Sequence, residues 1–162
     1  MRRGRWAVLF VSGILVLGGA AIAHDWASEP ARQARDDGGT AGVRTVTLYK
    51  TPSCGCCKGY AAHLRRAGFQ VREVDLEDLS PTKRMLGIPP ELASCHTAAI
   101  DGYIVEGHVP IADIEHLLAE RPDIPGIALP GMPEGAPGMP GAKPDRLTLY
   151  TIENQPRAFP AQ

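Results

Sequence analysis

The apolar and polar positions from residue 43 onward follow the spacings of strands and helices in alternation. Residues 46–49 form a short β-rich run, and residues 57–67 carry apolar side chains on one helical face before a stop at Gly68. Residues 71–76 then alternate apolar and charged side chains, as a half-buried strand does. The first part of the pattern therefore predicts a strand, a helix and a second strand.

The pattern continues with a second helix, a hairpin and a third helix. Ser80 is predicted to be the N-cap of the second helix. Asp101 and Gly102 are typical of the turn of a hairpin, here between residues 97 and 105, and Pro110 begins a helix with an apolar stripe. The resulting β-α-β-α-β-β-α order predicts an α/β domain of thioredoxin-like fold, with a central mixed sheet and flanking helices.

Proline and glycine dominate residues 122–145, which we interpret as an irregular loop without helix or strand. Residues 146–152 resume the alternation of a strand and would fix the far end of this loop, making it an ordered flap. The globular domain is therefore predicted to span residues 43–155, with residues 156–162 as a tail.

The N-terminal residues have the order of a secretory signal peptide. A basic start with Arg2, Arg3 and Arg5 precedes an apolar run over residues 6–23, which ends in an Ala-x-Ala pattern. The alternative is an uncleaved membrane anchor, because the run is near the ~18 residues that a membrane span requires. Both interpretations place the remainder outside the cytoplasm, with the polar residues 24–42 as a flexible linker.

Composition and charge narrow the function classes. A chain of 162 residues with 44% hydrophobic residues has room for one modest globular domain. Removal of the signal peptide takes away three arginines and no acidic residue, so the net charge falls from -1 to -4. This acidic balance argues against nucleic acid as a partner.

Three of the four cysteines lie in the segment SCGCC, as Cys54, Cys56 and Cys57, and the fourth is Cys95. Disulfides are the ordinary use of cysteine in an exported protein. A disulfide between the adjacent Cys56 and Cys57 would be strained, because consecutive α-carbons are only about 3.8 Å apart. Cys54 and Cys57 form the C-x-x-C pairing of redox proteins, which leaves Cys56 and Cys95 to pair with each other or to stay free.

The three clustered cysteines lie at the start of the predicted first helix. Unsatisfied backbone N–H groups and partial positive charge at that position lower the pKa of thiols. Thiolates act both in disulfide exchange and as ligands of soft metals. C-x-C-C is cramped for three ligands around one zinc ion, but it suits thiolates that bridge several Cu(I) ions. Dithiol redox chemistry and a multinuclear copper site both remain open.

A second group of candidate ligands lies farther along the chain. Cys95 and His96 precede the third strand, in the loop that faces the active-site cysteines of thioredoxin-like folds, and could complete the site. Met132 and Met139 supply thioethers, which bind Cu(I) without deprotonation. The alternatives are an ordinary hydrogen-bonded histidine at position 96 and loop packing by the methionines. His108 is a weaker candidate for a supporting contact.

Two further histidines are not expected to be ligands. His63 and His116 fall on the polar faces of the first and third predicted helices.

The order of these motifs resembles one protein family. C-x-C-C in YKTPSCGCCKGYAAHLRRAGFQV, S-C-H-T in LGIPPELASCHTAAIDGYIVEGHVP, and the methionine-bearing PGMPEGAPGMPG follow one another along the chain. Together they closely resemble the CopG-like copper-resistance family of exported thioredoxin-like proteins.

This resemblance implies a periplasmic copper-binding protein of copper homeostasis and resistance, with copper ions and other periplasmic copper-handling proteins as partners. It implies multinuclear Cu(I) at the cysteine motif and an interconversion of Cu(I) and Cu(II), which would make the protein a copper oxidoreductase. The implied metal ligands are Cys54, Cys56, Cys57, Cys95, His96, Met132 and Met139. The alternatives are a periplasmic thiol–disulfide oxidoreductase with Cys54 and Cys57 as catalytic residues, and an iron–sulfur electron carrier.

Overall fold

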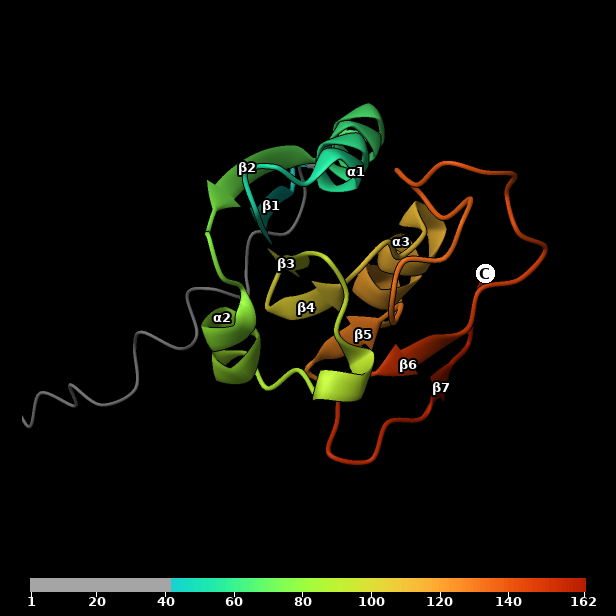
Figure 1. The fold of residues 1–162 in the computed structure, drawn as a ribbon. Coiled ribbons are helices and arrows are strands. Elements are labelled where there is room, and N and C mark those ends of the chain that lie inside the picture. Colours follow the sequence, from blue (N-terminus) through green and yellow to red (C-terminus); the bar gives the residue numbers. More distant parts are fainter. Residues whose placement is uncertain (1–41) are drawn as a thin grey trace, which may run out of the picture. The chain divides into compact units, whose positions relative to one another are not determined.

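The computed structural model describes residues 42–162 (Figure 1). The predicted signal peptide of residues 1–23, and the predicted linker apart from its last residue, lie outside the described residues. None of the helices within residues 42–162 combines the length and apolar character needed to cross a bilayer.

A single mixed sheet runs through the described residues. Its seven strands have the order β2-β1-β3-β4-β5-β6-β7. β1 pairs in parallel with β2, and β4 with β5, whereas the other neighbours are antiparallel. The strands are β1 (Thr45–Lys50), β2 (Gln70–Asp75), β3 (Thr97–Ile100), β4 (Tyr103–Glu106), β5 (Gly126–Ala128), β6 (Leu149–Thr151) and β7 (Ala158–Phe159).

Helices lie on both faces of this sheet. They are α1 (Gly55–Arg66), α2 (Ser80–Met85), the 3₁₀-helix η2 (Pro90–Leu92) and α3 (Ile111–Glu120) (Figure 1). Apolar residues of α1 and α3 share one core cluster with the sheet, whereas Ile88 and Leu92 belong to a second cluster. Val105 of β4 belongs to the first cluster and its neighbour Ile104 packs against the second, because successive strand residues point to opposite faces. The prediction of an α/β domain with a central mixed sheet and flanking helices is confirmed.

The interpretation of residues 122–145 as free of strands is wrong at one point. Gly126–Ala128 forms β5, in the interior of the sheet between β4 and β6, and all three residues are buried. A side chain at Gly126 would collide with the backbone of Ile104, so only glycine allows this close pairing. The surrounding prolines obscured a strand of three residues.

Residues 156–162 are likewise more than a tail. Ala158–Phe159 forms β7 against β6, and Phe159 is buried in the first core cluster. The N–H of Gln162 donates a hydrogen bond of 2.8 Å to the Asp113 carboxylate of α3. A two-residue strand has no alternation, so no sequence period could indicate it.

The N-cap of α2 also differs from the prediction. Leu79 occupies that position, and Ser80 is the first helical residue. The Asp78 carboxylate accepts a hydrogen bond of 2.8 Å from the Ser80 N–H.

Residues 129–148, which we call the methionine loop, connect β5 to β6 and pack back onto the domain. The Gly131 N–H donates to the Ala93 carbonyl over 3.2 Å, and Ala136 is buried in the first core cluster. Gly138 lies against α1, where a methyl group at Gly59 would be only 2.9 Å from the Gly138 carbonyl oxygen. These contacts agree with the prediction of an ordered flap held at both ends.

Candidate metal centre

The first cysteine segment is shaped by the N-terminus of α1. Cys54 is the N-cap, and its sulfur accepts a hydrogen bond of 3.2 Å from the Cys57 N–H. The Cys54 N–H donates to the Thr51 carbonyl over 3.1 Å, which closes the turn between β1 and the helix. Cys56 and Cys57 lie in the first turn of α1, as predicted. The helix start therefore brings three sulfur atoms into one small volume.

Cys95 brings a fourth sulfur to this volume from the loop before β3. Its Sγ atom lies 3.7 Å from Cys56 Sγ and 3.6 Å from Cys57 Sγ. Cys54 Sγ lies 3.4 Å from Cys56 Sγ, and all four sulfurs are within 4.8 Å of one another. The prediction that the two loops face each other is confirmed. β1 and β3 are neighbours in the sheet, so the loop that follows β1 meets the loop that precedes β3.

Two of the four cysteines are joined covalently. Cys54 and Cys57 form a disulfide with their α-carbons 5.3 Å apart, and Cys56 and Cys95 are free. Of the pairings open from the sequence, the structure thus contains the C-x-x-C disulfide and not the Cys56–Cys95 bond. The donor set of four thiolates consequently forms only when this disulfide is reduced.

Burial governs the chemistry of Cys95. Removal from water, together with the neighbouring Cys56, raises the pKa of the Cys95 thiol to about 12. This thiol is therefore protonated at neutral pH, unless a cation compensates for the loss of solvation. A metal ion bound among the sulfurs would supply that positive charge.

Two buried imidazoles adjoin the sulfur cluster. His96 Nδ1 lies 3.3 Å from Cys95 Sγ, and His108 Nε2 lies 3.0 Å from the same atom. Burial lowers the pKa of His96 to about 3, and burial also lowers the pKa of His108. Both rings are neutral at neutral pH and can donate a lone pair to a metal. Cys95, His96 and His108 thus form a second group of potential ligands, with ligand atoms within 4.8 Å of one another.

The Nε2 atom of His96 is buried and has no hydrogen-bond partner. An unpaired buried nitrogen costs free energy unless another group satisfies it. The predicted ligand His96 lies beside Cys95, which it contacts through its other ring nitrogen, Nδ1.

Tyr60 of α1 fixes the positions of these two rings. Its ring centroid lies 4.5 Å from that of His96 and 5.4 Å from that of His108. Its hydroxyl donates a hydrogen bond of 2.8 Å to the Val109 carbonyl, and burial raises its pKa. The helical period of α1 indicates only that Tyr60 is a core residue. Its contacts with His96 and His108 could not be predicted in this way, because those residues come from distant parts of the chain.

A buried ion pair holds the loop that carries Cys95 and His96. The Glu106 carboxylate is fully buried on β4 and accepts hydrogen bonds of 2.6 Å from the Ser94 N–H and from the Thr97 hydroxyl. Lys83 of α2 forms an ion pair with the same carboxylate and donates to the Thr97 hydroxyl over 3.0 Å. Sequence reasoning missed this network, because a charged residue at the end of a strand usually faces water.

The two methionines of the methionine loop have different surroundings. Met132 is exposed, whereas Met139 is half-buried against the core cluster. Met139 also lines a pocket beside Cys56, and His63 of α1 lines the same pocket. The prediction that His63 lies on a solvated face is therefore only partly right. His116 of α3 packs beside Phe159 of β7, with the two ring centroids 5.7 Å apart.

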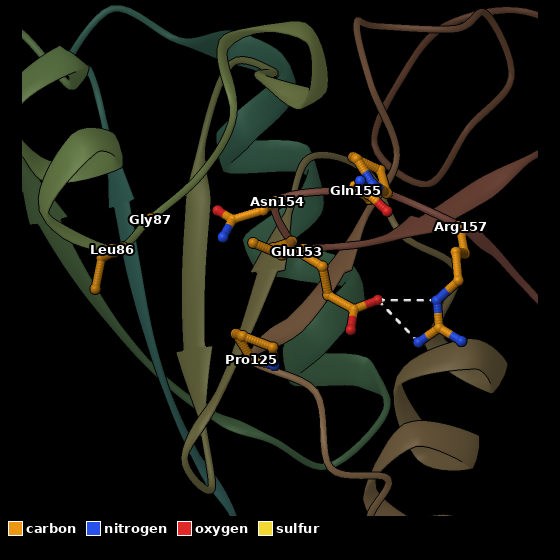
Figure 2. A pocket seen from close by; sticks show the side chains of 9 residues that line it. Leu86, Gly87, Pro125, Glu153, Asn154, Gln155 and Arg157 are labelled. Carbon is orange, nitrogen blue, oxygen red and sulfur yellow. Dashed lines mark hydrogen bonds and ion pairs between the residues drawn. The ribbon is translucent and has the colours of Figure 1, made fainter.

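A larger pocket of about 890 Å³ lies elsewhere on the domain (Figure 2). The Glu153 carboxylate points toward Arg157 within it, and the two form an ion pair of 2.9 Å. Its other lining residues are Leu86, Gly87, Pro125, Ile152, Asn154, Gln155 and Pro156. Because none of them is a cysteine, histidine or methionine, this pocket is separate from the candidate metal centre.

Comparisons with known proteins found one matching family and two similar solved structures. A family described as "Protein of unknown function, DUF411" matches residues 92–139, which include Cys95, His96 and Met139. No match was found among curated proteins. Two solved structures of copper resistance protein CopG, termed form 1 and form 2, are both 41% identical to the chain.

The likeness to these structures extends over the folded domain. Form 1 covers 70% of the present chain, which in turn covers 93% of form 1, with a TM-score of 0.63. For form 2 the corresponding values are 72%, 94% and 0.64. At this identity and coverage, the chain belongs to the family of the copper resistance protein CopG.

Proposed function

We propose that the protein binds copper as Cu(I) at the four-cysteine cluster and serves copper homeostasis and resistance. The observation that carries this proposal is the convergence of Cys54, Cys56, Cys57 and Cys95, with all four sulfurs within 4.8 Å of one another. The name of the similar CopG structures, copper resistance protein, supports the choice of metal.

The donor set favours Cu(I) over harder ions. Thiolate sulfur prefers Cu(I), and carboxylates, the usual ligands of Mg²⁺ and Ca²⁺, are absent from both ligand groups in the described part of the chain. Sulfurs separated by 3.4 to 3.7 Å are close enough for one metal ion to contact two of them. Such crowding favours several bridged copper ions over one isolated ion.

The ligand set that we propose consists of residues that hold the copper cluster and of weaker donors outside it. Cys54, Cys56, Cys57, Cys95 and His96 hold the copper cluster, and His108 supports it through Cys95. Met132 and Met139 are proposed as weaker thioether donors outside the cluster. This arrangement separates the strong thiolate donors of the cluster from the weaker thioether donors of the methionine loop.

Loading of the full cluster requires reduction of the Cys54–Cys57 disulfide. Two electrons and two protons convert the disulfide to two thiols, and a protein dithiol is the chemical class of reductant that we expect. In the reverse direction, the two thiols can reduce two Cu(II) ions to Cu(I) as the disulfide forms and two protons are released. This balance supports the proposed interconversion of Cu(I) and Cu(II).

The proposal includes a thioredoxin-like fold and a periplasmic location. The element order β1-α1-β2-α2-β3-β4-α3 and the sheet order β2-β1-β3-β4 support the thioredoxin-like assignment. The signal-like pattern of residues 1–23 supports export to the periplasm, where other copper-handling proteins would exchange copper with this one.

Anaerobic competition for Cu(I) tests the proposed function. The protein is reduced, freed of metal, and titrated with Cu(I) against bathocuproine disulfonate, which absorbs light when it binds Cu(I). We expect the protein to withdraw more than one equivalent of copper, about one or more ions per pair of thiolates. The proposal fails if the reduced protein removes no more than a trace.

A thiol–disulfide oxidoreductase is the second candidate function. The Cys54–Cys57 disulfide and the partial exposure of Cys54 favour it, because an attacking thiol from a substrate needs access to one sulfur. The two functions make opposite predictions for the replacement of Cys56.

A further inference from the structure

The pocket between α1 and the methionine loop contains two potential metal donors, His63 and Met139, that lie outside the four-cysteine cluster. Its lining includes Cys56, His63 and Met139, and its volume is about 550 Å³. We propose that this pocket is a copper acquisition site, in which His63 and Met139 take up Cu(I) and pass it to Cys56. The inference rests on the proposed function, because it assigns the route by which copper reaches the cluster.

The helix geometry of α1 places the residues of this helix that line the pocket in one row. Cys56, Gly59, His63 and Arg66 are spaced by three or four residues, so they share one face of the helix, and all four line the pocket. His63 lies about 10 Å along the helix axis from Cys56, at about 1.5 Å per residue. His63 therefore lies at the end of this row that is remote from the sulfur cluster.

The methionine loop forms the opposite wall of the pocket. Gly138, Met139 and Pro140 line it, and Gly138 approaches α1 so closely that a methyl group at Gly138 would lie 2.9 Å from the Cys56 carbonyl oxygen. Met139 is the residue after this contact and is held half-buried. Its thioether is thereby kept close to the helix row that leads to Cys56.

The exposure of the cysteine sulfurs also indicates that copper reaches the cluster from the side of this pocket. Cys56 is half-buried and lines the pocket, whereas Cys57 is fully buried. Cys56 is a free thiol, so it can accept an ion even while Cys54 and Cys57 are joined. Among the four cysteines, Cys56 is therefore the sulfur that receives copper from this pocket.

Imidazole and thioether donors suit a transient step. Both are neutral ligands that need not lose a proton, and two of them bind Cu(I) more weakly than several thiolates do. Copper moves by ligand exchange without a change in oxidation state. Bonds to the carrier break as bonds to His63 and Met139 form, and the Cys56 sulfur then replaces these two donors and releases its proton to water.

Arg66 also lines the pocket and is exposed. A guanidinium repels a free cation but attracts an anion. The acquisition site is therefore suited to Cu(I) delivered within an anionic complex, such as the Cu(I) complex of bicinchoninate, which serves as the probe below.

Stopped-flow transfer of Cu(I) from the bicinchoninate complex to the reduced full-length protein tests the inference. The variants are His63→Ala, Met139→Leu and the double variant, and leucine keeps most of the packing of the half-buried methionine. The controls are His116→Ala on α3 and Met85→Leu, because Met85 is exposed at the end of α2 and neither residue lines this pocket. Equilibrium affinity is measured separately against bathocuproine disulfonate.

We expect each single variant to slow transfer about fivefold and the double variant about twentyfold or more, and we expect these losses of rate to exceed any loss of equilibrium affinity. Both controls should transfer copper at the unsubstituted rate. The acquisition site is refuted if the double variant transfers within about twofold of that rate, or if affinity falls as much as the rate. If the unsubstituted reduced protein takes no Cu(I), the proposed function fails and the acquisition site fails with it.

Discussion

The Nε2 atom of His108 lies 3.0 Å from the Sγ atom of Cys95, although the two residues are thirteen positions apart in the chain. The other ring nitrogen, Nδ1, lies 2.7 Å from the Pro137 carbonyl oxygen. A carbonyl only accepts hydrogen bonds, so Nδ1 carries the proton and Nε2 directs its lone pair toward the sulfur. His108 thus connects the methionine loop to the cluster and orients Cys95.

Replacement of His108 by asparagine separates these two contacts. The asparagine amide can still donate to the Pro137 carbonyl, but the nitrogen that faces Cys95 is lost. We expect the affinity for Cu(I) to fall about tenfold or more, because Nε2 is the acceptor positioned to take the proton that Cys95 loses when it binds copper. Chelator competition measures this loss, and thermal unfolding checks that the domain is intact. An unchanged affinity would show that His108 does not support the cluster.

Substitution of single cysteines distinguishes a copper cluster from a dithiol redox site. In a bridged cluster, Cys56→Ser should reduce copper binding about as much as Cys57→Ser, because both sulfurs contact Cys95 in the same volume. An oxidoreductase that uses Cys54 and Cys57 should tolerate Cys56→Ser and lose insulin-reducing activity in Cys57→Ser. Metal-free insulin reduction that survives Cys56→Ser would favour the oxidoreductase.

Gly138 is predicted to hold the methionine loop on α1. Its φ angle is +85°, and a methyl group there would lie 2.5 Å from the Tyr60 backbone nitrogen. We expect Gly138→Ala to lower the free energy of unfolding by about 2 to 3 kcal/mol, from backbone strain and steric overlap combined. Gly131→Ala is the matched control, because Gly131 has φ of +68° but open space around it, and it should cost about 1 kcal/mol. Equal losses in urea unfolding would show that the Gly138 contact with α1 contributes nothing.

The Glu106 carboxylate should matter more for stability than an exposed one. Glu106→Gln leaves the charge of Lys83 without its partner in a buried site, and we expect a loss of about 3 kcal/mol. The matched control is Glu153→Gln, because Arg157 in that ion pair is exposed and the substitution should cost much less than Glu106→Gln. Urea unfolding of both variants measures the difference, and a loss at Glu106 no larger than at Glu153 would refute the role of the buried pair.

The buried imidazole of His96 should make the metal-free protein sensitive to mild acid. Its pKa is lowered to about 3 in the folded state, from 6.5, chiefly by burial. Below pH 6.5 the unfolded chain therefore binds a proton that the folded state does not. The free energy of unfolding should fall with decreasing pH, by up to about 1.4 kcal/mol per pH unit.

Urea unfolding between pH 7 and 5 measures this slope. His96→Gln removes the titrating group, so its slope should be shallower than that of the unsubstituted protein. NMR signals of the His96 ring should show no protonation over the same range while the domain stays folded. Identical slopes in the two proteins would contradict the assignment of a neutral, buried His96.

Much of the fold follows from local patterns. The helical face of α1 and the hairpin turn at Asp101 and Gly102 each depend on residues close in the sequence, and the structure has both. β5 and β7 were missed, because strands of three and two residues are stabilised by pairing with distant neighbours. The local pattern of apolar and polar residues does not indicate such pairing.

The candidate site, like the fold, was predictable from the sequence where it depends on local signals. Thiols at a helix start and a Cys-His pair before the third strand are local signals, and the element order predicted that they would meet. The approach of His108 and Glu106 to this loop was not predictable in that way, because it depends on the register of β4 against β3. The separate positions of Met132 and Met139 likewise depend on how the methionine loop folds back onto α1.

X-ray absorption at the copper K edge, on the reduced full-length protein loaded with Cu(I), tests the central claim most directly. Copper held by the four converging cysteines should give an edge typical of Cu(I) and a ligand shell dominated by sulfur, with copper–copper scattering from a bridged cluster. Cys56→Ser and Cys95→Ser should both weaken the sulfur signal. A shell of only nitrogen and oxygen, or a spectrum that neither substitution changes, would contradict copper binding at this site.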